Sequence, residues 1–398
     1  MKPLRLLKID SVHPPEALAG LQKRVGMDWE AMSYERYYDW LMSQRLNLSD
    51  YLTKPMRDAG WEAREFVPAD PVLIQKMREA SGEKTKTAMG LKEFGQFVAS
   101  LTPRAIAAGR TCELYRQSVR SRRIAECIAE FRPDVLFVRE PCHVDGRVLD
   151  AFRGKCLIVG MIASDPKHAW NWDASRHDVI FTATPEYRDY FRALGIRSEI
   201  VPFGVDERVA GEVAGLPKIH DCTFVGYLGA PHQRKKTELL ARVAGDVDFK
   251  WWGVKGPEIG EFPALERTYQ GKAAGLDMLK IYKQSKIVVN DYPDFMQGHS
   301  NNMRNMEVFG VGSFLLARAA EALRSLEAEG ALATFTDADD CVGKIKHYLK
   351  NDEERERIAA RGLQVALRDF NYKDITRKMM DAIAEVREQR SCGGKVGR

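Results

Sequence analysis

Residues 290–317, NDYPDFMQGHSNNMRNMEVFGVGSFLLA, decide the fold of this chain. The stretch begins at the end of a short apolar run, Lys286–Asn290, which has the pattern of a buried parallel strand. A polar loop follows, then a helical segment at Met303–Phe309, and then Gly310-Val311-Gly312, which leads into another apolar strand. Because parallel α/β sheets bind ligands at the carboxyl ends of their strands, the polar loop is a candidate nucleotide site.

Three features of the helical segment fit a nucleotide. Ser300 or Asn301 would cap its N-terminus, where free N–H groups attract phosphate. Glu307, one turn past the cap, would accept two hydrogen bonds from a ribose 2′,3′-diol. Gly310 and Gly312 would allow the helix and the next strand to approach closely. In a second interpretation, which the sequence leaves open, Glu307 is a solvated helix carboxylate and the glycines only stop the helix.

Length and composition indicate a reduced protein of two domains. A chain of 398 residues exceeds what one compact core accommodates. Its net charge of +5 is small and spread along the sequence, which suits anionic ligands without requiring nucleic acid. Seven cysteines form no Cys-x-x-Cys pair and no zinc-like spacing with the eight histidines, so we expect a reduced cytoplasmic compartment.

No segment of the sequence has the pattern of a membrane span or a signal peptide. Charges near the N-terminus, such as Lys2 and Arg5, interrupt any signal-peptide core. The longest apolar run, Leu157–Ala163, is far shorter than the ~20 residues that span a bilayer. We therefore expect a cytoplasmic protein, with or without peripheral contact at the inner face of the membrane.

The N-terminal half opens with strands and a region rich in helix. Leu4–Asp10 is typical of a strand, Tyr34–Ala59 of one long amphipathic helix that ends near Gly60, and Glu62–Val67 of a second strand. Residues 71–130 are predominantly helical and charged.

From residue 133 onward, strands and helices alternate. Pro185 after Thr184 fits the first turn of a helix, and Gly195 fits its end. This alternation predicts a parallel, doubly wound sheet. The expected strands are Asp134–Arg139, Cys156–Ala163, Asp178–Thr182 and Glu199–Pro202, and the expected helices are Asp145–Phe152 and Pro185–Leu194.

The alternation restarts after a segment rich in glycine, alanine and proline. Strands are expected at Asp221–Gly226, Phe249–Gly253 and Lys286–Asn290, and helices at Arg234–Ala244, Leu276–Ser285, Ala338–Asn351 and Asp352–Asp369. The sequence thus predicts an α/β protein of two Rossmann-like, doubly wound parallel-sheet domains that face each other across a cleft. We place the N-terminal domain at residues 1–207, the link at 208–218, the C-terminal domain at 219–372, and a helix crossing back to the N-terminal domain, with a flexible tail, at 373–398.

With this architecture the chain resembles the GT-B glycosyltransferases of the group-1 type, and most closely their CgeB-like, or spore-maturation-like, branch. The resemblance covers about Arg132 to Ala384. The matching motifs are Asn302-Met303-Arg304 followed by Glu307 and Gly310-Val311-Gly312-Ser313-Phe314-Leu315-Leu316, then Phe224-Val225-Gly226 with His232, Arg234 and Lys235, and lastly Val201-Pro202-Phe203-Gly204-Val205-Asp206.

The resemblance implies transfer of a sugar from a nucleoside-diphosphate donor, UDP- or GDP-linked, to a glycan, lipid-linked or protein acceptor in cell-envelope or surface glycan synthesis. The C-terminal domain would bind the donor and the N-terminal domain the acceptor. By position, Glu307 would hold the ribose, and Arg234 with Lys235 would neutralise the diphosphate. The donor-binding residues that the resemblance implies are Gly226, Arg234, Lys235, Ser300, Asn302, Arg304, Glu307, Gly310 and Gly312.

Two places depart from the family pattern. Retaining members carry a glutamate where this chain has His299, which can hydrogen-bond a sugar hydroxyl or a phosphate oxygen but does not reproduce a carboxylate. The glycine-rich loop often found after the first strand is replaced by Asp10-Ser11-Val12-His13-Pro14-Pro15. The stereochemical outcome and the identity of the acceptor are therefore left open by the sequence.

Glycosyl transfer builds negative charge on the leaving diphosphate, so cationic side chains and helix N–H groups lower its barrier. Arg234, Lys235 and the helix that begins near Ser300 would supply them, whereas Lys236 is expected to face solvent. No Asp-x-Asp pair lies in a metal-binding loop, and we expect that neither a metal nor another cofactor is required.

The acceptor side needs a different set of residues at the strand ends of the N-terminal domain. Asp165 is the first choice for a general base, and in the alternative it only caps the turn Ser164-Asp165-Pro166. His143 is either an acid–base group or a loop histidine, and Trp170 and Trp172 either stack on a sugar or pack under their loop. The catalytic candidates are Asp165, His143 and His299, and the acceptor-binding candidates are His13, Glu140, Trp170 and Trp172.

Two other classes of protein stay open as interpretations. A nucleic-acid binder is suggested by Arg116, Arg120, Arg122 and Arg123, but no aromatic interleaving or binding motif accompanies them, so we expect no nucleic-acid partner. A GT-B relative that transfers no sugar, such as a nucleotide-sugar epimerase or an inactive nucleotide-binding module, is suggested by His299.

Overall fold

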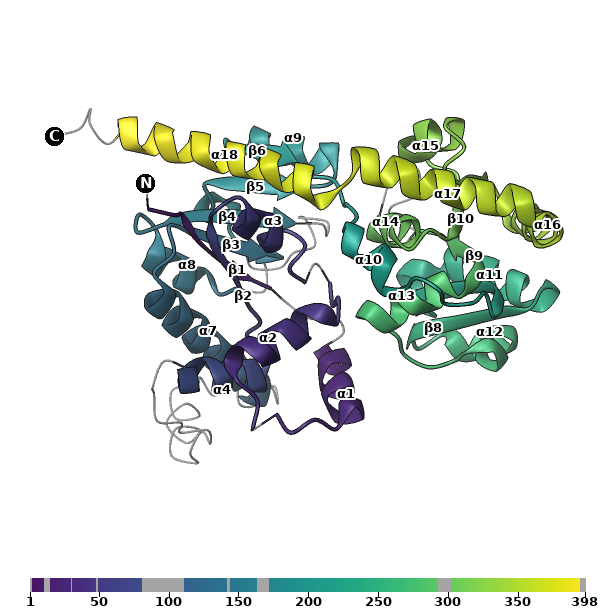
Figure 1. The fold of residues 1–398 in the computed structure, drawn as a ribbon, viewed down its shortest axis with the longest axis horizontal. Helices are drawn as coiled ribbons and strands as arrows, with labels where there is room; N and C mark the ends of the chain where they lie inside the picture. The colour runs from purple at the N-terminus through teal and green to yellow at the C-terminus, as the bar shows by residue number, and fades with distance from the viewer. Residues whose placement is uncertain are drawn as a thin grey trace. The chain divides into compact units, whose positions relative to one another are not determined.

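Two compact units make up the chain (Figure 1). The structure is a computed structural model that describes residues 2–10, 15–29, 31–47, 49–80, 111–141, 144–162, 172–292 and 302–393. Unit 1 consists of Met1–Val201 together with Met379–Arg398, and unit 2 of Pro202–Lys378. The division at Val201 falls ahead of the link predicted at residues 208–218.

Unit 1 contains a six-stranded, all-parallel sheet, as the alternating pattern predicts. The strand order is β2-β1-β3-β4-β5-β6. Each expected strand is present within two residues of its predicted bounds, because runs of buried apolar residues mark strands that are covered on both faces. The bounds are β1 Arg5–Ile9, β2 Glu62–Phe66, β3 Val135–Arg139, β4 Leu157–Ile162, β5 Val179–Thr182 and β6 Ser198–Ile200.

The helices of unit 1 lie between these strands in the sequence, apart from the last, which returns from unit 2. Their bounds are α1 Pro15–Val25, α2 Tyr34–Ser43, α3 Thr53–Asp58, α4 Pro71–Ala80, α7 Thr111–Phe131, α8 Gly146–Phe152, α9 Pro185–Ala193 and α18 Tyr372–Gly393, with a short 3₁₀ helix at Ala174–Arg176.

The single helix expected over Tyr34–Ala59 is wrong, because α2 and α3 are separate helices with a turn between them. In that turn Arg45, Asn47 and Ser49 adopt left-handed backbone conformations, with φ of 53°, 51° and 41°, which an α-helix does not contain. The Ser49 carbonyl accepts a hydrogen bond from Lys8 Nζ of β1 at 2.5 Å. A contact with a distant strand thus stabilises a break that no glycine or proline marks in the sequence.

His177 is buried in unit 1 without a hydrogen-bond partner for either ring nitrogen among the residues that the structure describes. Its ring lies edge-on to Trp172, with 5.5 Å between the ring centroids. Gly160 leaves room for the imidazole, because a Cβ at that position would lie 2.9 Å from His177 Cδ2. Burial lowers the pKa of His177 to about 4, since the charged imidazolium is poorly solvated there.

Unit 1 is therefore expected to lose stability as the pH falls from about 6.5 to about 4. In this window the unfolded chain binds a proton at His177 and the folded chain does not, so each pH unit removes up to about 1.4 kcal/mol. His177→Phe should remove this dependence. Denaturant unfolding of both proteins at about pH 7.5 and about pH 4.5 measures the difference, and an equal acid sensitivity in the two proteins would contradict the expectation.

Unit 2 contains a five-stranded parallel sheet with the order β11-β10-β9-β7-β8. The strands are β7 His220–Leu228, β8 Phe249–Lys255, β9 Ser285–Asn290, β10 Phe314–Arg318 and β11 Ala333–Phe335. The helices are α10 Glu207–Glu212, α11 Arg234–Asp246, α12 Pro263–Thr268, α13 Gly275–Lys283, α14 Met303–Gly310, α15 Arg324–Ala328, α16 Ala338–Lys350 and α17 Asp352–Asp369, with 3₁₀ helices at Pro231–Gln233, Ile259–Glu261 and Glu321–Leu323.

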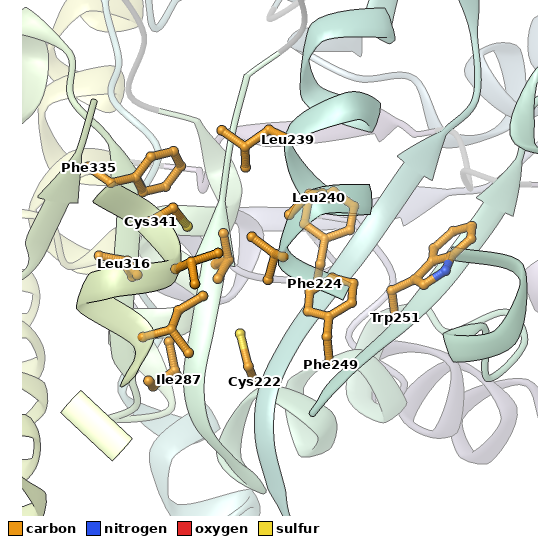
Figure 2. Close-up of a cluster of buried hydrophobic side chains, with 14 of the residues drawn as sticks. Cys222, Phe224, Leu239, Leu240, Phe249, Trp251, Ile287, Leu316, Phe335 and Cys341 are labelled. Carbon is orange, nitrogen blue, oxygen red and sulfur yellow. The ribbon is translucent and has the colours of Figure 1, made fainter. Parts of the chain in front are cut away.

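One face of this sheet packs against α11 and α16 to form a hydrophobic core (Figure 2). Cys222 of β7 lies in register with Phe249 of β8, and alternate residues of each strand point to the same face. Burial of each large side chain contributes roughly 1.5–3 kcal/mol. The residues labelled in Figure 2 are Cys222, Phe224, Leu239, Leu240, Phe249, Trp251, Ile287, Leu316, Phe335 and Cys341.

The first residues of unit 2 are bound to the chain that precedes α18. The Val205 N–H donates to the Phe370 carbonyl at 2.8 Å, and the Val205 carbonyl accepts from the Tyr372 N–H at 3.0 Å. The link predicted at residues 208–218 contains most of α10, whose N-terminus is capped by the Asp206 side chain. This passage is thus an ordered part of unit 2.

The residues of α18 are divided between the units, with its first turns in unit 2 and the remainder in unit 1. In unit 1, Arg390 forms an ion pair with Asp178, and Glu385 accepts a hydrogen bond from Arg197 at 2.6 Å. These contacts attach the end of the helix to residues just before β5 and β6.

Within the described part of the chain, no helix is long and apolar enough to cross a membrane. The cysteines with described environments, Cys127, Cys156, Cys222 and Cys341, are buried and form no disulfide with one another.

Candidate functional site

A polar cluster lies in unit 2 where β9 ends and α14 begins. Asn290, the last residue of β9, is fully buried. Its Nδ2 donates to Asn302 Oδ1 at 2.9 Å and to Asn305 Oδ1 at 2.6 Å. Its Oδ1 accepts from Arg304 Nη1 at 2.6 Å. The side-chain amide of Asn290 therefore forms hydrogen bonds with three other side chains of the segment 290–317.

The N-terminus of α14 is capped by Asn302, so the expectation that Ser300 or Asn301 caps it is wrong. The Asn302 side chain accepts a hydrogen bond from the Asn305 N–H, and Asn302 has the extended backbone of a capping residue, with φ of −111°. The Asn290 amide also donates a hydrogen bond to this Asn302 oxygen, which favours Asn302 as the capping residue.

Arg304 is directed from α14 toward the end of β7. Its guanidinium carbon lies 4.7 Å from the centroid of the Phe224 ring, a distance typical of a cation–π contact. A Cβ added at Gly226 would lie 2.6 Å from Arg304 Nη2. Gly226, a predicted donor-binding residue, thus makes space for this guanidinium. Arg304 Nε is buried and has no hydrogen-bond partner among the described residues.

Glu307 is half-buried on α14, and the described residues provide its carboxylate with no hydrogen bond or ion pair. Burial raises the pKa of its carboxyl group to about 7, although the charge of Arg304 opposes the shift. The buried Tyr282 hydroxyl of α13 faces both Arg304 and Glu307, and it makes no hydrogen bond of good geometry within the described chain. The Glu307 carboxyl group is therefore partly desolvated.

Two glycines follow Glu307. Gly310 leaves space for the Val205 side chain, and Gly312 ends the helix. Gly310 is the last residue of α14, and a Cβ there would lie 3.5 Å from Val205 Cγ1. Gly312 has φ of +64°, and its N–H donates to the Phe309 carbonyl at 2.9 Å. A left-handed residue in this place terminates a helix, and glycine adopts that conformation at least cost.

Arg234, expected to neutralise a diphosphate, lies at the start of α11 among carboxylates. It pairs with Glu238 at 2.8 Å, Glu261 at 2.6 Å and Glu258 at 3.4 Å. These hydrogen bonds raise the pKa of Arg234. Lys235 beside it is exposed. An anion at this helix start would therefore compete with carboxylates for Arg234.

Lys236 is buried, so the expectation that it faces solvent is wrong. Its Nζ lies 5.6 Å from the centroid of the Phe224 ring. The sequence contains a signal for this placement, because Lys236 shares a helical face with Leu239, Leu240 and Val243, which are buried. Together with Arg304, Lys236 brings a second cation to the Phe224 ring of β7.

Two of the predicted acceptor-side residues lie in the described part of unit 1. Glu140 follows β3 and is buried, with a left-handed φ of 53°. Trp172 is half-buried and packs against His177 and against Phe191, whose ring centroid is 5.6 Å away. The predicted site residues that lie outside the described residues are His13, His143, Asp165, Trp170, His299 and Ser300.

The described residues contain no group of three or more histidine, cysteine, aspartate or glutamate side chains placed to hold a metal ion. Of the residues in the polar cluster, sequence reasoning did not identify Asn290, Tyr282 or the role of Phe224. Asn290 was identified only as the end of a strand, Phe224 only as part of the motif Phe224-Val225-Gly226, and Tyr282 only as part of an expected helix.

A comparison with protein families finds that residues 234–381 match the family described as glycosyl transferase-like. No curated protein matches the sequence. Among solved structures, sucrose-phosphate synthase from Thermosynechococcus elongatus is similar at 14% identity and a TM-score of 0.55, over 97% of this chain and 100% of that one. Anabaena HepE in complex with UDP is similar at 12% identity and a TM-score of 0.54, over 96% of this chain and 100% of that one.

A glycosyltransferase from Rickettsia africae is also similar in structure, at 9% identity and a TM-score of 0.54, over 97% of this chain and 99% of that one. At these identities the likeness concerns the fold, and it extends over both units. Residues 234–381 thus match the glycosyl transferase-like family, and the two parallel α/β sheets of the chain give it the fold of GT-B glycosyltransferase structures.

Proposed function

We propose that this protein is a glycosyltransferase that takes a sugar from a nucleoside-diphosphate donor. The observation that carries the proposal is Glu307, a half-buried carboxylate without a partner among the described residues, at the carboxyl-end edge of a parallel sheet. A buried carboxylate without a partner costs free energy in the empty protein. A ribose 2′,3′-diol supplies two donors to it, and the cost is then offset when the ligand binds.

The diphosphate of the donor would lie near positive charges at the same edge of the unit 2 sheet. Arg304 and Lys236 both lie over the ring of Phe224, the central residue of β7. The free N–H groups at the start of α14 add a partial positive charge. Such fixed charges stabilise the leaving diphosphate as the anomeric bond breaks. Arg234 and Lys235 stay in the proposal as further phosphate ligands at the start of α11.

The comparisons support this proposal for the donor. Anabaena HepE, with the same fold, has structures in complex with UDP and with UDP-glucose. The segment that matches the glycosyl transferase-like family begins at Arg234 and includes Glu307. We therefore propose a UDP- or GDP-linked sugar as donor, and membership of the CgeB-like branch.

On the acceptor side, the proposal is a glycan, lipid-linked or protein acceptor that unit 1 binds, in a cytoplasmic enzyme that requires no metal. The acid–base candidates are Asp165, His143 and His299, and the acceptor contacts are His13, Glu140, Trp170 and Trp172. Glu140 has one feature that supports this role, since left-handed backbone in a residue other than glycine is concentrated at functional sites.

The proposal is tested by calorimetric titration of the full chain with UDP, GDP, TDP and CMP, and with the sugar-linked form of any nucleotide that binds. We expect one nucleoside diphosphate to bind selectively, because UDP and GDP share the ribose and the diphosphate and differ in the base, whereas CMP lacks the second phosphate. Glu329→Gln, which changes a carboxylate paired with Arg361 and Arg368 elsewhere in unit 2, is the control for nonspecific charge effects. Failure of every nucleotide and nucleotide sugar to bind would refute the proposal.

A further inference from the structure

Helix α14 carries two opposite charges that do not pair. Arg304 and Glu307 are three residues apart, a spacing at which side chains on a helix meet and ion pairs form readily. The structure nevertheless contains no ion pair between them, although both are described. The Glu307 carboxylate has no partner among the described residues, and Arg304 is bound elsewhere.

The residue that holds Arg304 away is Asn290. Its Oδ1 accepts from Arg304 Nη1 at 2.6 Å, and this hydrogen bond directs the guanidinium toward the Phe224 ring and into the space beside Gly226. The guanidinium therefore contacts three groups of the sheet edge and none of the carboxylate oxygens of its own helix.

The orientation of the Asn290 amide is itself fixed. Its Nδ2 donates to the side-chain oxygens of Asn302 and Asn305, at 2.9 and 2.6 Å. Because the nitrogen has two acceptors, the oxygen is the atom that faces Arg304. A rotated amide would place a donor against the guanidinium and would lose all three hydrogen bonds.

Few other groups act on Glu307. Among the described residues, the charged or titratable groups that influence it are Arg304 on its own helix and the Tyr282 hydroxyl on α13. Arg304 is the described cation whose charge acts on Glu307, so a released Arg304 would be free to pair with it. A pair of that kind would occupy the oxygens that a diol needs.

We propose that Asn290 is a positioning residue, which holds Arg304 against the sheet edge and thereby keeps Glu307 unpaired for a ribose diol. The ligand in this proposal rests on the proposed function, whereas the separation of the two charges does not. Asn290 acts through Arg304 and needs no contact with the ligand.

The separation is tested in the full chain without nucleotide, by the carbon-13 NMR titration of the Glu307 carboxyl, assigned by comparison with Glu307→Gln. The wild-type midpoint is expected near pH 7. In Asn290→Ala the released Arg304 pairs with Glu307, so the midpoint falls by about one pH unit or more. Asn290→Asp keeps an oxygen for Arg304, and its midpoint should stay at or above that of the wild type.

Two further variants distinguish positioning from a general loss of structure. Asn305→Ala removes one acceptor of the Asn290 amide but leaves its oxygen on Arg304, so the midpoint should not fall. Adding Arg304→Ala to Asn290→Ala removes the cation and should return the midpoint to the wild-type value or above it. If Asn290→Ala does not fold, Asn290→Ser replaces it, since the shorter side chain also withdraws the oxygen. An unchanged midpoint in the folded variant would overturn the proposal.

The role toward the ligand is measured separately, by titration with the nucleotide that the wild type binds. Asn290→Ala should bind it about tenfold more weakly at about pH 8, and Asn290→Asp should bind it more tightly than Asn290→Ala does. A midpoint shift with unchanged affinity would overturn the part of the proposal that concerns ribose. A midpoint shift in a protein that binds no nucleotide would support the positioning role and refute the proposed function.

Discussion

Glu307→Gln is expected to weaken the binding of a nucleotide sugar by roughly 100-fold or more. A hydrogen bond to a charged group contributes about 1.5–3 kcal/mol, and a diol makes two of them to a carboxylate. Replacing the carboxylate by an amide removes the charge from both bonds and places a donor beside one hydroxyl. The variant should fold well, because it removes a buried carboxylate that has no partner among the described residues of the empty protein. Titration calorimetry of both proteins measures the loss.

The same carboxylate predicts the pH dependence of binding. Burial raises the pKa of Glu307 to about 7, so the acceptor form of the group increases as the pH rises through that value. Affinity for a nucleotide sugar such as UDP-glucose should therefore increase from about pH 6 to about pH 8 and be nearly level in Glu307→Gln. A nucleotide sugar is preferred to a free nucleotide because a terminal phosphate itself titrates near pH 6.

A 2′-deoxyribose form of the ligand provides the control. The deoxyribose form should bind the wild type more weakly than the ribose form does. The substitution Glu307→Gln should then weaken binding of the deoxyribose form less than binding of the ribose form, since one of the two hydroxyls is already absent. Equal losses for the two ligands would mean that Glu307 acts on another part of the nucleotide.

Gly253→Ala is expected to destabilise unit 2 by more than about 4 kcal/mol, a loss that only a specific clash produces. Gly253 lies in β8 with φ of +133°, and an added Cβ would lie 1.8 Å from the carbonyl oxygen of Gly226 in the neighbouring strand. The three nearest atoms are all backbone atoms of Gly226, so no flexible side chain can move aside for the methyl group. The clash falls on the strand end that accommodates Arg304, so nucleotide binding should fail together with stability. Denaturant unfolding and nucleotide titration measure the two effects.

Gly343→Ala is the matched control for this substitution. Gly343 lies exposed in α16, and a Cβ there meets nothing within 4 Å. Alanine in a helix interior should stabilise unit 2 by roughly 0.5–1 kcal/mol. If the free energy of unfolding of Gly253→Ala lay within about 1 kcal/mol of the wild-type value, the close approach of β7 and β8 would not be a requirement of the fold.

Most strands could be predicted from the sequence because they contain short runs of buried apolar residues and alternate with helices. β11 and α10 were not found, since three to six residues carry too little periodicity to distinguish them from loops. The break between α2 and α3 was missed for another reason. It depends on Lys8, a residue of a strand far away in the sequence.

The site could be predicted only in outline. The helix that carries Glu307 and the glycine that ends it follow from local pattern, and both are present. The contact of Arg304 with Phe224 joins segments that are distant in the sequence, and no local pattern encodes it. The cap was placed one or two residues too early, because Ser300, Asn301 and Asn302 are all good capping residues and the hydrogen bond from Asn290 selects among them.

The division of α18 between the two units has a consequence for the order in which the chain folds during synthesis. Unit 2 is one continuous segment, whereas unit 1 lacks the segment that begins at Met379 until all of unit 2 has been synthesised. Until then Asp178 and the Cys156 carbonyl have no Arg390 to bind. Domains usually fold at the ribosome from the N-terminus onward. In this protein all of unit 2 is synthesised before the part of α18 that belongs to unit 1, so unit 2 can be completed first.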